Sequence, residues 1–169
     1  WCIYTAENKK YGISNGTPLL EGDLTRAASD GSARFPLAGK FYIIATLTDA
    51  GTISCKLEIE ENINDALFRL TGSFSSNASY NDSAAYEFKN VGNNTYELTI
   101  DAEAGTTWKV HSSPFATFCT MEDGTSATDG ELHTNWKGAC RFSEAGKYKI
   151  TLYLGIGNEK FLTYRYDKE

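Results

Sequence analysis

The chain has 169 residues, of which 41% are hydrophobic, and a formal net charge of −6. This length suits one or two domains, and the acidic balance leaves no basic patch for phosphates, which argues against a nucleic-acid partner. No apolar run reaches the roughly 18 residues that a membrane span needs. Ten tyrosines and nine phenylalanines stand against one methionine, a composition that favours strands over helices.

The first third of the chain predicts, in order, a strand that lacks its beginning, a loop and a hairpin. Trp1–Thr5 alternates apolar and polar residues, and Ala6–Gly31 is rich in turn-forming residues. Phe35–Leu47 and Thr52–Ile59 flank a short turn with a glycine and are expected to form a hairpin. The polar, acidic segment Glu60–Asp65 is the expected module boundary.

The remainder predicts further short strands. They are expected at 68–74, 86–88, 96–100, 107–111, 148–154 and 160–166. A turn is expected at Val91–Asn94, and a long irregular loop at Ser112–Lys137. About seven strands at roughly ten-residue spacing predict an antiparallel β-sandwich. A loop of about 25 residues in so compact a domain is usually functional or disordered, and we expect a functional one.

An internal repeat organises these elements. Arg34–Ile43 resembles Arg141–Ile150 at a shift of 107 positions, and the same shift places Trp1 on Trp108 and Gly31 on Gly138. Phe68–Thr107 has no counterpart in the first copy. The prediction is therefore an all-β chain of tandem antiparallel β-sandwich modules of Ig-like or CBM-like type, with residues 1–63 the C-terminal part of one module and 64–169 a complete one. On this interpretation the chain is a fragment of a larger protein.

Four cysteines allow three disulfide pairings. Cys2 and Cys55 fall in the partial module, and Cys119 and Cys140 in the complete one. Pairing within modules would imply an oxidising compartment, and four buried free thiols are the alternative. No cysteine spacing typical of a zinc site is present.

The candidate binding residues lie in two loops. Asn135, Trp136 and Lys137 are neighbours in a polar, glycine-containing stretch, with His133 just before them. An exposed aromatic ring beside amide and ammonium donors is typical of sugar binding, because the ring packs on the C–H face of a pyranose while the donors meet its hydroxyls. Tyr80 and Tyr86 could add a second aromatic surface. The alternative is that Trp136 only closes the open end of the sandwich.

Other chemistry has less support. Phe115 and Phe118 are expected in the core. The acidic residues Glu122, Asp123 and Asp129 could reach Ca²⁺, but they lack EF-hand spacing, so a solvated acidic loop is the default and no cofactor is expected. No carboxylate pair or nucleophile–base arrangement is recognisable, and we expect no enzyme.

Several segments carry a family resemblance. Phe68–Phe74, Asn94–Ile100, Ala104–Val110 and Glu144–Leu152 together resemble the repeated domains of SusE/SusF-type glycan-binding lipoproteins of Bacteroidetes outer membranes. The resemblance covers the second module and the end of the first. It implies carbohydrate-binding β-sandwich modules displayed on the cell surface, anchored by a lipid outside this chain, with other glycan-uptake proteins as partners.

The leading hypothesis is thus non-catalytic binding of a polysaccharide or oligosaccharide through an aromatic platform centred on Trp136. Two rivals stay open. One is a structural or adhesive Ig-like spacer without sugar affinity. The other is the accessory part of a glycoside hydrolase whose catalytic domain lies elsewhere.

Overall fold

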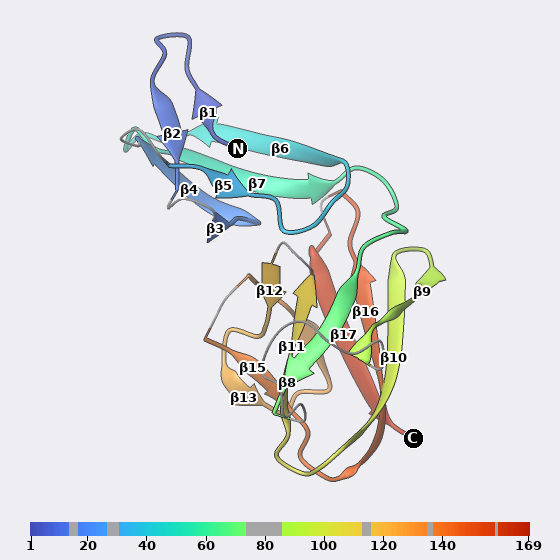
Figure 1. The fold of residues 1–169 in the computed structure, drawn as a ribbon. Coiled ribbons are helices and arrows are strands. Elements are labelled where there is room, and N and C mark those ends of the chain that lie inside the picture. The colour runs from blue at the N-terminus through green and yellow to red at the C-terminus, as the bar shows by residue number, and fades with distance from the viewer. Residues whose placement is uncertain (14–16, 27–30, 74–85, 113–115, 135–136, 158) are drawn as a thin grey trace.

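In the computed structural model the chain is a series of β-strands joined by turns and loops (Figure 1). The structure describes residues 1–13, 17–26, 31–73, 86–112, 116–134, 137–157 and 159–169. No α-helix occurs in these residues, and nearly all strand pairs are antiparallel, so the predicted all-β class is confirmed. None of the described residues belongs to a helix long and apolar enough to cross a membrane.

The N-terminal module, our name for residues 1–63, consists of one curved sheet and a small extra pair of strands. Its strands are β1 (Ile3–Tyr4), β2 (Lys10–Gly12), β3 (Thr17–Pro18), β4 (Glu21–Arg26), β5 (Ala33–Arg34), β6 (Phe41–Leu47) and β7 (Ile53–Ile59). The sheet has the order β1-β2-β4-β7-β6, while β3 and β5 pair in parallel. Strand β6 is therefore an edge.

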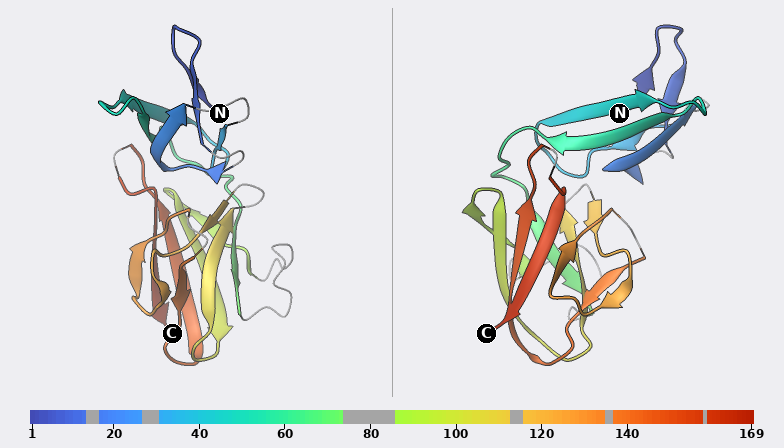
Figure 2. Two further views of the ribbon diagram at one scale, coloured as in Figure 1. Left: turned by 90° about the vertical axis from the view of Figure 1, so that its left-hand side faces the viewer. Right: turned by 180° about the vertical axis from the view of Figure 1, so that it is seen from behind.

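The C-terminal module, residues 64–169, is a sandwich of two sheets (Figure 2). One sheet has the order β14-β17-β16-β10-β9, and the other the order β12-β11-β15-β13 with β8 paired to β11. Their bounds are β8 (Phe68–Gly72), β9 (Lys89–Gly92), β10 (Thr95–Ala102), β11 (Thr107–Ser112), β12 (Ala116–Phe118), β13 (Asp123–Thr125), β14 (Asp129–Glu131), β15 (Ala139–Arg141), β16 (Gly146–Leu154) and β17 (Leu162–Lys168).

The core lies between these two sheets, where alternating residues of each strand point inward. Phe68 and Trp108 from one sheet meet Ile150, Leu152 and Tyr164 from the other in a single cluster, and each is at most 2% exposed, so burial of these side chains supplies the main stabilisation. Phe118, expected in the core, is fully buried there, whereas Phe115 lies outside the described residues.

The sequence repeat has a counterpart in strand pairing. β11–β17 follow one another as β1–β7 do, and four pairings recur: β1·β2 and β11·β12, β4·β7 and β14·β17, β6·β7 and β16·β17, and the parallel pairs β3·β5 and β13·β15. Strands β8, β9 and β10 have no counterpart in the described part of the N-terminal module. The module boundaries themselves stay a prediction.

Several expected loops contain strands. The stretch 6–31 holds β2, β3 and β4, and the stretch 112–137 holds β12, β13 and β14. These strands have two to six residues, so their alternation is too short to recognise against turn-rich sequence. The turn expected at Val91–Asn94 is narrower, because Val91 and Gly92 belong to β9 and only Asn93 and Asn94 form the turn, with φ of 50° and 56°. Positive φ at both residues is typical of a two-residue hairpin turn.

The joint between the modules is held by buried contacts. Ile63, in the expected boundary segment, is 3% exposed and belongs to the core of the C-terminal module. The Ile63 amide donates to Asn94 Oδ1 at 2.6 Å, and Asn94 Nδ2 donates to the Leu154 carbonyl at 3.3 Å. Across the joint, Ser112 Oγ donates to the Pro36 carbonyl. The connection is thus a packed joint and not a free linker.

Candidate functional site

The long loop that carries the predicted binding residues is tied to the sandwich at its centre. Cys119 and His133 form an isolated antiparallel bridge with two backbone hydrogen bonds of 2.9 Å and 2.8 Å. Phe118 and Leu132, the residues directly before Cys119 and His133, are both buried. The backbone of His133 is therefore fixed, while its side chain remains 37% exposed.

His133 lines a hollow between the two modules, here called the junction cleft, of about 230 Å³. The cleft is lined from both modules by Leu20, Glu21, Lys56, Leu57, Glu131, His133, Glu159, Lys160 and Phe161. Its apolar members are two leucines and Phe161, and the rest are ionisable. The cleft therefore combines an apolar surface with hydrogen-bonding groups of both charges.

Polar groups in the cleft are already arranged in pairs. Glu131 on β14 accepts from Lys160 Nζ at 2.9 Å, and its other carboxylate oxygen lies 4.0 Å from His133 Nδ1. Lys56, on β7 of the other module, pairs with Glu58 at 2.8 Å. A carboxylate held between an ammonium group and an imidazole offers an acceptor next to donors, which matches adjacent sugar hydroxyls, since each hydroxyl both donates and accepts.

The aromatic member of the cleft belongs to a stack that crosses the joint. Phe161 lies between Phe41 of the N-terminal module, at 6.3 Å between ring centroids, and Phe118, at 6.2 Å, with interplanar angles of 11° and 12°. Phe161 is 8% exposed, so only a small part of its side chain is accessible in the cleft. The stack fixes the position of one cleft wall relative to the other.

Lys137 is exposed, and Ala139, two positions after it, lines a second hollow. This hollow, of about 330 Å³, is on the sheet that contains β8, β11 and β15, and is lined by Thr71, Gly72, Ser73, Thr107, Trp108, Lys109 and Ala139. Ala139 follows Lys137 by two positions, and Ser73 directly precedes the segment 74–85 that contains Tyr80. The described ends of both predicted loops thus lead to this hollow.

The structure does not bring all the predicted residues together. Asn135, Trp136 and Tyr80 lie outside the described residues. Tyr86 is half-buried and packs against the core cluster, so only part of its ring is available to a ligand. Of His133 and Lys137, only His133 lines the junction cleft. The assignment of these residues as ligand-binding stays a prediction.

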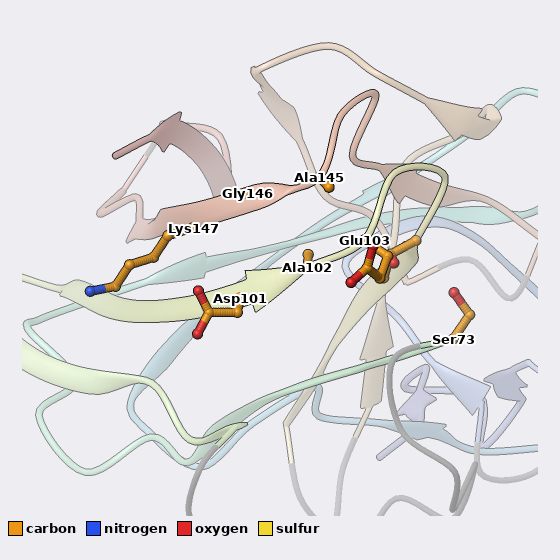
Figure 3. A pocket seen from close by; sticks show the side chains of 8 residues that line it. Ser73, Asp101, Ala102, Glu103, Ala145, Gly146 and Lys147 are labelled. Atoms are coloured by element: carbon orange, nitrogen blue, oxygen red, sulfur yellow. The ribbon is translucent and has the colours of Figure 1, made fainter.

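A third hollow lies at the end of the C-terminal module away from the joint (Figure 3). Asp101 and Glu103 come from the end of β10 and the turn after it, Lys147 from the neighbouring β16, and Ser73 from the end of β8. This hollow measures about 620 Å³ but has no aromatic side chain in its lining. Lys147 is already paired with Glu169 at 3.5 Å. The third hollow therefore offers no aromatic ring against which a sugar ring could pack.

All four cysteines are free thiols in the structure, so the within-module disulfides are not formed and the alternative of free thiols describes it. Cys55, Cys119 and Cys140 are buried, and Cys2 is half-buried. Burial raises the pKa of the Cys140 thiol to about 12, and a hydrogen bond with Tyr164 opposes this shift only in part. Cys140 therefore stays protonated and acts as a small apolar core residue.

The acidic residues of the long loop do not converge. Asp123 lies on β13 and Asp129 on β14, which belong to different sheets. Among the described residues no group of three or more His, Cys, Asp or Glu side chains is placed to hold a metal ion. No Ca²⁺ site is assigned to these residues.

Sequence reasoning missed the cleft residues contributed by other elements. Glu21 and Lys56 come from strands of the N-terminal module, Glu131 comes from β14, and Lys160 and Phe161 come from the turn before β17. The one signal in the sequence is the charged pair Glu159-Lys160. This pair directly precedes Phe161 in the turn between two largely apolar strands.

Comparison with known proteins assigns no family to the chain. No protein-family model matches the chain. No curated protein matches it. Among solved structures, one described as the ligand induced structure of AmyP-SBD, a starch-binding domain, aligns with a TM-score of 0.46 and 22% sequence identity. The alignment covers 64% of this chain and 76% of that chain. A likeness at this level assigns neither a family nor a ligand to the chain.

Proposed function

We propose that this chain is a non-catalytic carbohydrate-binding protein. The observation that carries the proposal is the junction cleft, where apolar side chains lie beside Glu131, whose carboxylate lies 2.9 Å from Lys160 Nζ and 4.0 Å from His133 Nδ1. Small-ligand sites characteristically combine a mainly apolar lining with a few placed polar groups. At about 230 Å³ the cleft is smaller than the 300–1,000 Å³ typical of drug-sized ligands, which suits a single sugar residue of a longer chain.

The loop that leaves the cleft after His133 supplies the second part of the proposed site. Trp136 is the proposed aromatic platform, with Asn135 and Lys137 as donors to hydroxyl groups and Tyr80 and Tyr86 as a further aromatic surface. Because His133 is fixed by the bridge to Cys119, the loop begins at a defined position beside the cleft.

The ligand is a neutral saccharide in this proposal. The cleft holds three carboxylates, Glu21, Glu131 and Glu159, against two ammonium groups, Lys56 and Lys160. An excess of negative charge disfavours a uronic acid, whose own carboxylate would be repelled. Neutral glucans, mannans and xylans are therefore expected to bind better than pectin.

The proposed setting is the bacterial cell surface, with a lipid anchor outside these residues and other glycan-uptake proteins as partners. It rests on the sequence resemblance to SusE/SusF-type lipoproteins.

A spacer without sugar affinity is the second candidate, because one observation favours it. The packed joint, with Ile63 buried and Phe41 stacked on Phe161, would hold two modules at a fixed angle whatever they bind. The spacer requires no ligand and predicts that replacement of Trp136 has no functional effect.

Affinity electrophoresis distinguishes the two candidates. The chain is run through gels that contain α-glucan, β-mannan, xylan, mixed-linkage glucan or pectin, beside Trp136→Ala and Tyr153→Ala variants. Tyr153 is a matched control, since it is 43% exposed on β16 and does not line the junction cleft. Retardation of the parent and of Tyr153→Ala, but not of Trp136→Ala, is expected in a neutral glycan. Equal migration of all three in every gel would contradict binding and favour the spacer.

A further inference from the structure

Strand β6 is an unusually apolar free edge. It pairs with β7 on one side and has no partner strand on the other within the described residues. Tyr42, Ile43, Ile44 and Leu47 are exposed by 53%, 42%, 46% and 69%. Natural proteins normally protect such edges with charges, prolines or bulges, because an exposed row of backbone groups between apolar side chains recruits another strand. β6 has none of these protections between Phe41 and Leu47.

The repeat identifies what covers the equivalent strand in the other module. β16 pairs with β17 as β6 pairs with β7, and its second edge is paired with β10 in an unbroken antiparallel ladder from Thr95↔Tyr153 to Ala102↔Gly146. The repeat places Gly39 on Gly146 and Thr46 on Tyr153. β6 therefore has the backbone of an interior strand without its neighbour.

The side chains of β6 support the same conclusion. Ile43 and Leu47 correspond to Ile150 and Leu154, which are 0% and 4% exposed because β8, β10 and β11 enclose them. Covering a large aliphatic side chain removes apolar surface from water and is therefore favourable. The uncovered inner face of β6 thus provides a substantial driving force for an added β-segment.

We propose that β6 accepts an additional β-segment of the type of β8–β10, whose last strand pairs antiparallel with β6 and whose alternating apolar side chains cover Ile43 and Leu47. The model for that strand is β10, where Tyr96, Leu98 and Ile100 point inward and are at most 8% exposed. In the C-terminal module β8–β10 directly precede Trp108, which the repeat places on Trp1. The inference is independent of the proposed sugar binding.

A fusion tests the proposal. A copy of residues 64–107 is joined before Trp1, which recreates the connection that this segment has to Trp108. Backbone amide hydrogen exchange is then measured by NMR for β6 and β7 in the chain with and without the fusion. The expected result is at least tenfold slower exchange of the β6 amides that point away from β7, with β7 amides unchanged. The C-terminal module in the same sample reports that the protein is folded.

Two controls keep the test decisive if the fusion packs poorly. A fusion carrying Leu98→Lys in the added copy should leave β6 unprotected, because the lysine cannot be buried. A synthetic peptide of residues 93–104, added to the unfused chain, should shift the resonances of Tyr42–Leu47 and should not do so with an Ile43→Lys chain. If neither the fusion nor the peptide protects β6, the proposal is overturned. A concentration-dependent dimer of the unfused chain, protected at β6, would also overturn it and assign the edge to a second copy.

Discussion

Asn94 shows how one residue can serve both a turn and the joint between modules. It adopts a left-handed backbone with φ of 56°, is 2% exposed, and hydrogen-bonds with its side chain to the Ile63 amide and the Leu154 carbonyl. Asparagine tolerates this conformation better than most residues. Its neighbour Asn93 has the same conformation, at φ of 50°, but is exposed.

This difference gives a prediction with a built-in control. Asn94→Gly keeps the backbone conformation and removes both hydrogen bonds, so the free energy of unfolding should fall by about 1–3 kcal/mol, the cost of leaving buried polar groups unpaired. Asn93→Gly should change stability by less than about 0.5 kcal/mol, as is usual for surface positions. Urea unfolding followed by tryptophan fluorescence measures both. Equal effects would show that the Asn94 side chain does not hold the joint.

At the scale of elements, Gly138 marks a place where two backbone segments pass very close to each other. A Cβ atom at this position would lie 1.5 Å from the Thr120 carbonyl oxygen and 3.1 Å from the Glu122 carbonyl oxygen. The chain after the proposed binding loop therefore passes directly against the backbone before β13. Only glycine permits this approach.

Gly138→Ala should consequently displace the loop. We expect a loss of about 3 kcal/mol, the upper end of the range for overpacked sites, together with loss of glycan retardation. Gly105→Ala is the control, since a Cβ there meets no atom within 4 Å and only the φ of +80° is unfavourable, at a cost of about 1 kcal/mol. Thermal denaturation and affinity gels measure the two effects. Unchanged stability of Gly138→Ala would refute the close approach.

The predictability of the elements followed their length and their contacts. Strands with long alternation, such as β8 and β10, were recognisable because each has one face in the core and one in solvent. β13 and β15 were not, since they are three residues long and pair in parallel across 13 intervening residues. A parallel pair of this kind has no local signal. Its formation depends on the rest of the sandwich.

At the scale of the whole molecule, the joint couples the modules through Phe161. This side chain is packed between Phe41 and Phe118 and also borders the junction cleft. Phe161→Ala should lower the free energy of unfolding by about 3–5 kcal/mol, as is typical of buried aromatic residues, and should separate one calorimetric transition into two. The exposed Tyr153→Ala is the control and should change stability by less than about 1 kcal/mol. A single, unshifted transition in Phe161→Ala would mean that the stack does not couple the modules.

Only part of the candidate site could be proposed from the sequence, because the cleft forms where the two modules pack together. His133 could be proposed from the composition of its loop, but Glu21 and Lys56 lie more than 70 residues away and reach the cleft only because the modules pack together. Charged residues on strands are ordinarily solvent-facing, so nothing in their local sequence marked them. The repeat indicated two modules, and the packing between them was not encoded in any single motif.

The central claim is that the chain binds neutral saccharides at the junction cleft and the adjoining loop. A glycan array of neutral and uronic-acid oligosaccharides, probed with the parent chain and with His133→Ala, tests it most directly. The account predicts binding of the parent to one class of neutral oligosaccharide, weakened at least tenfold in His133→Ala, which corresponds to about 1.4 kcal/mol. Absence of binding to every neutral glycan, or binding that is unaffected in His133→Ala, would contradict it.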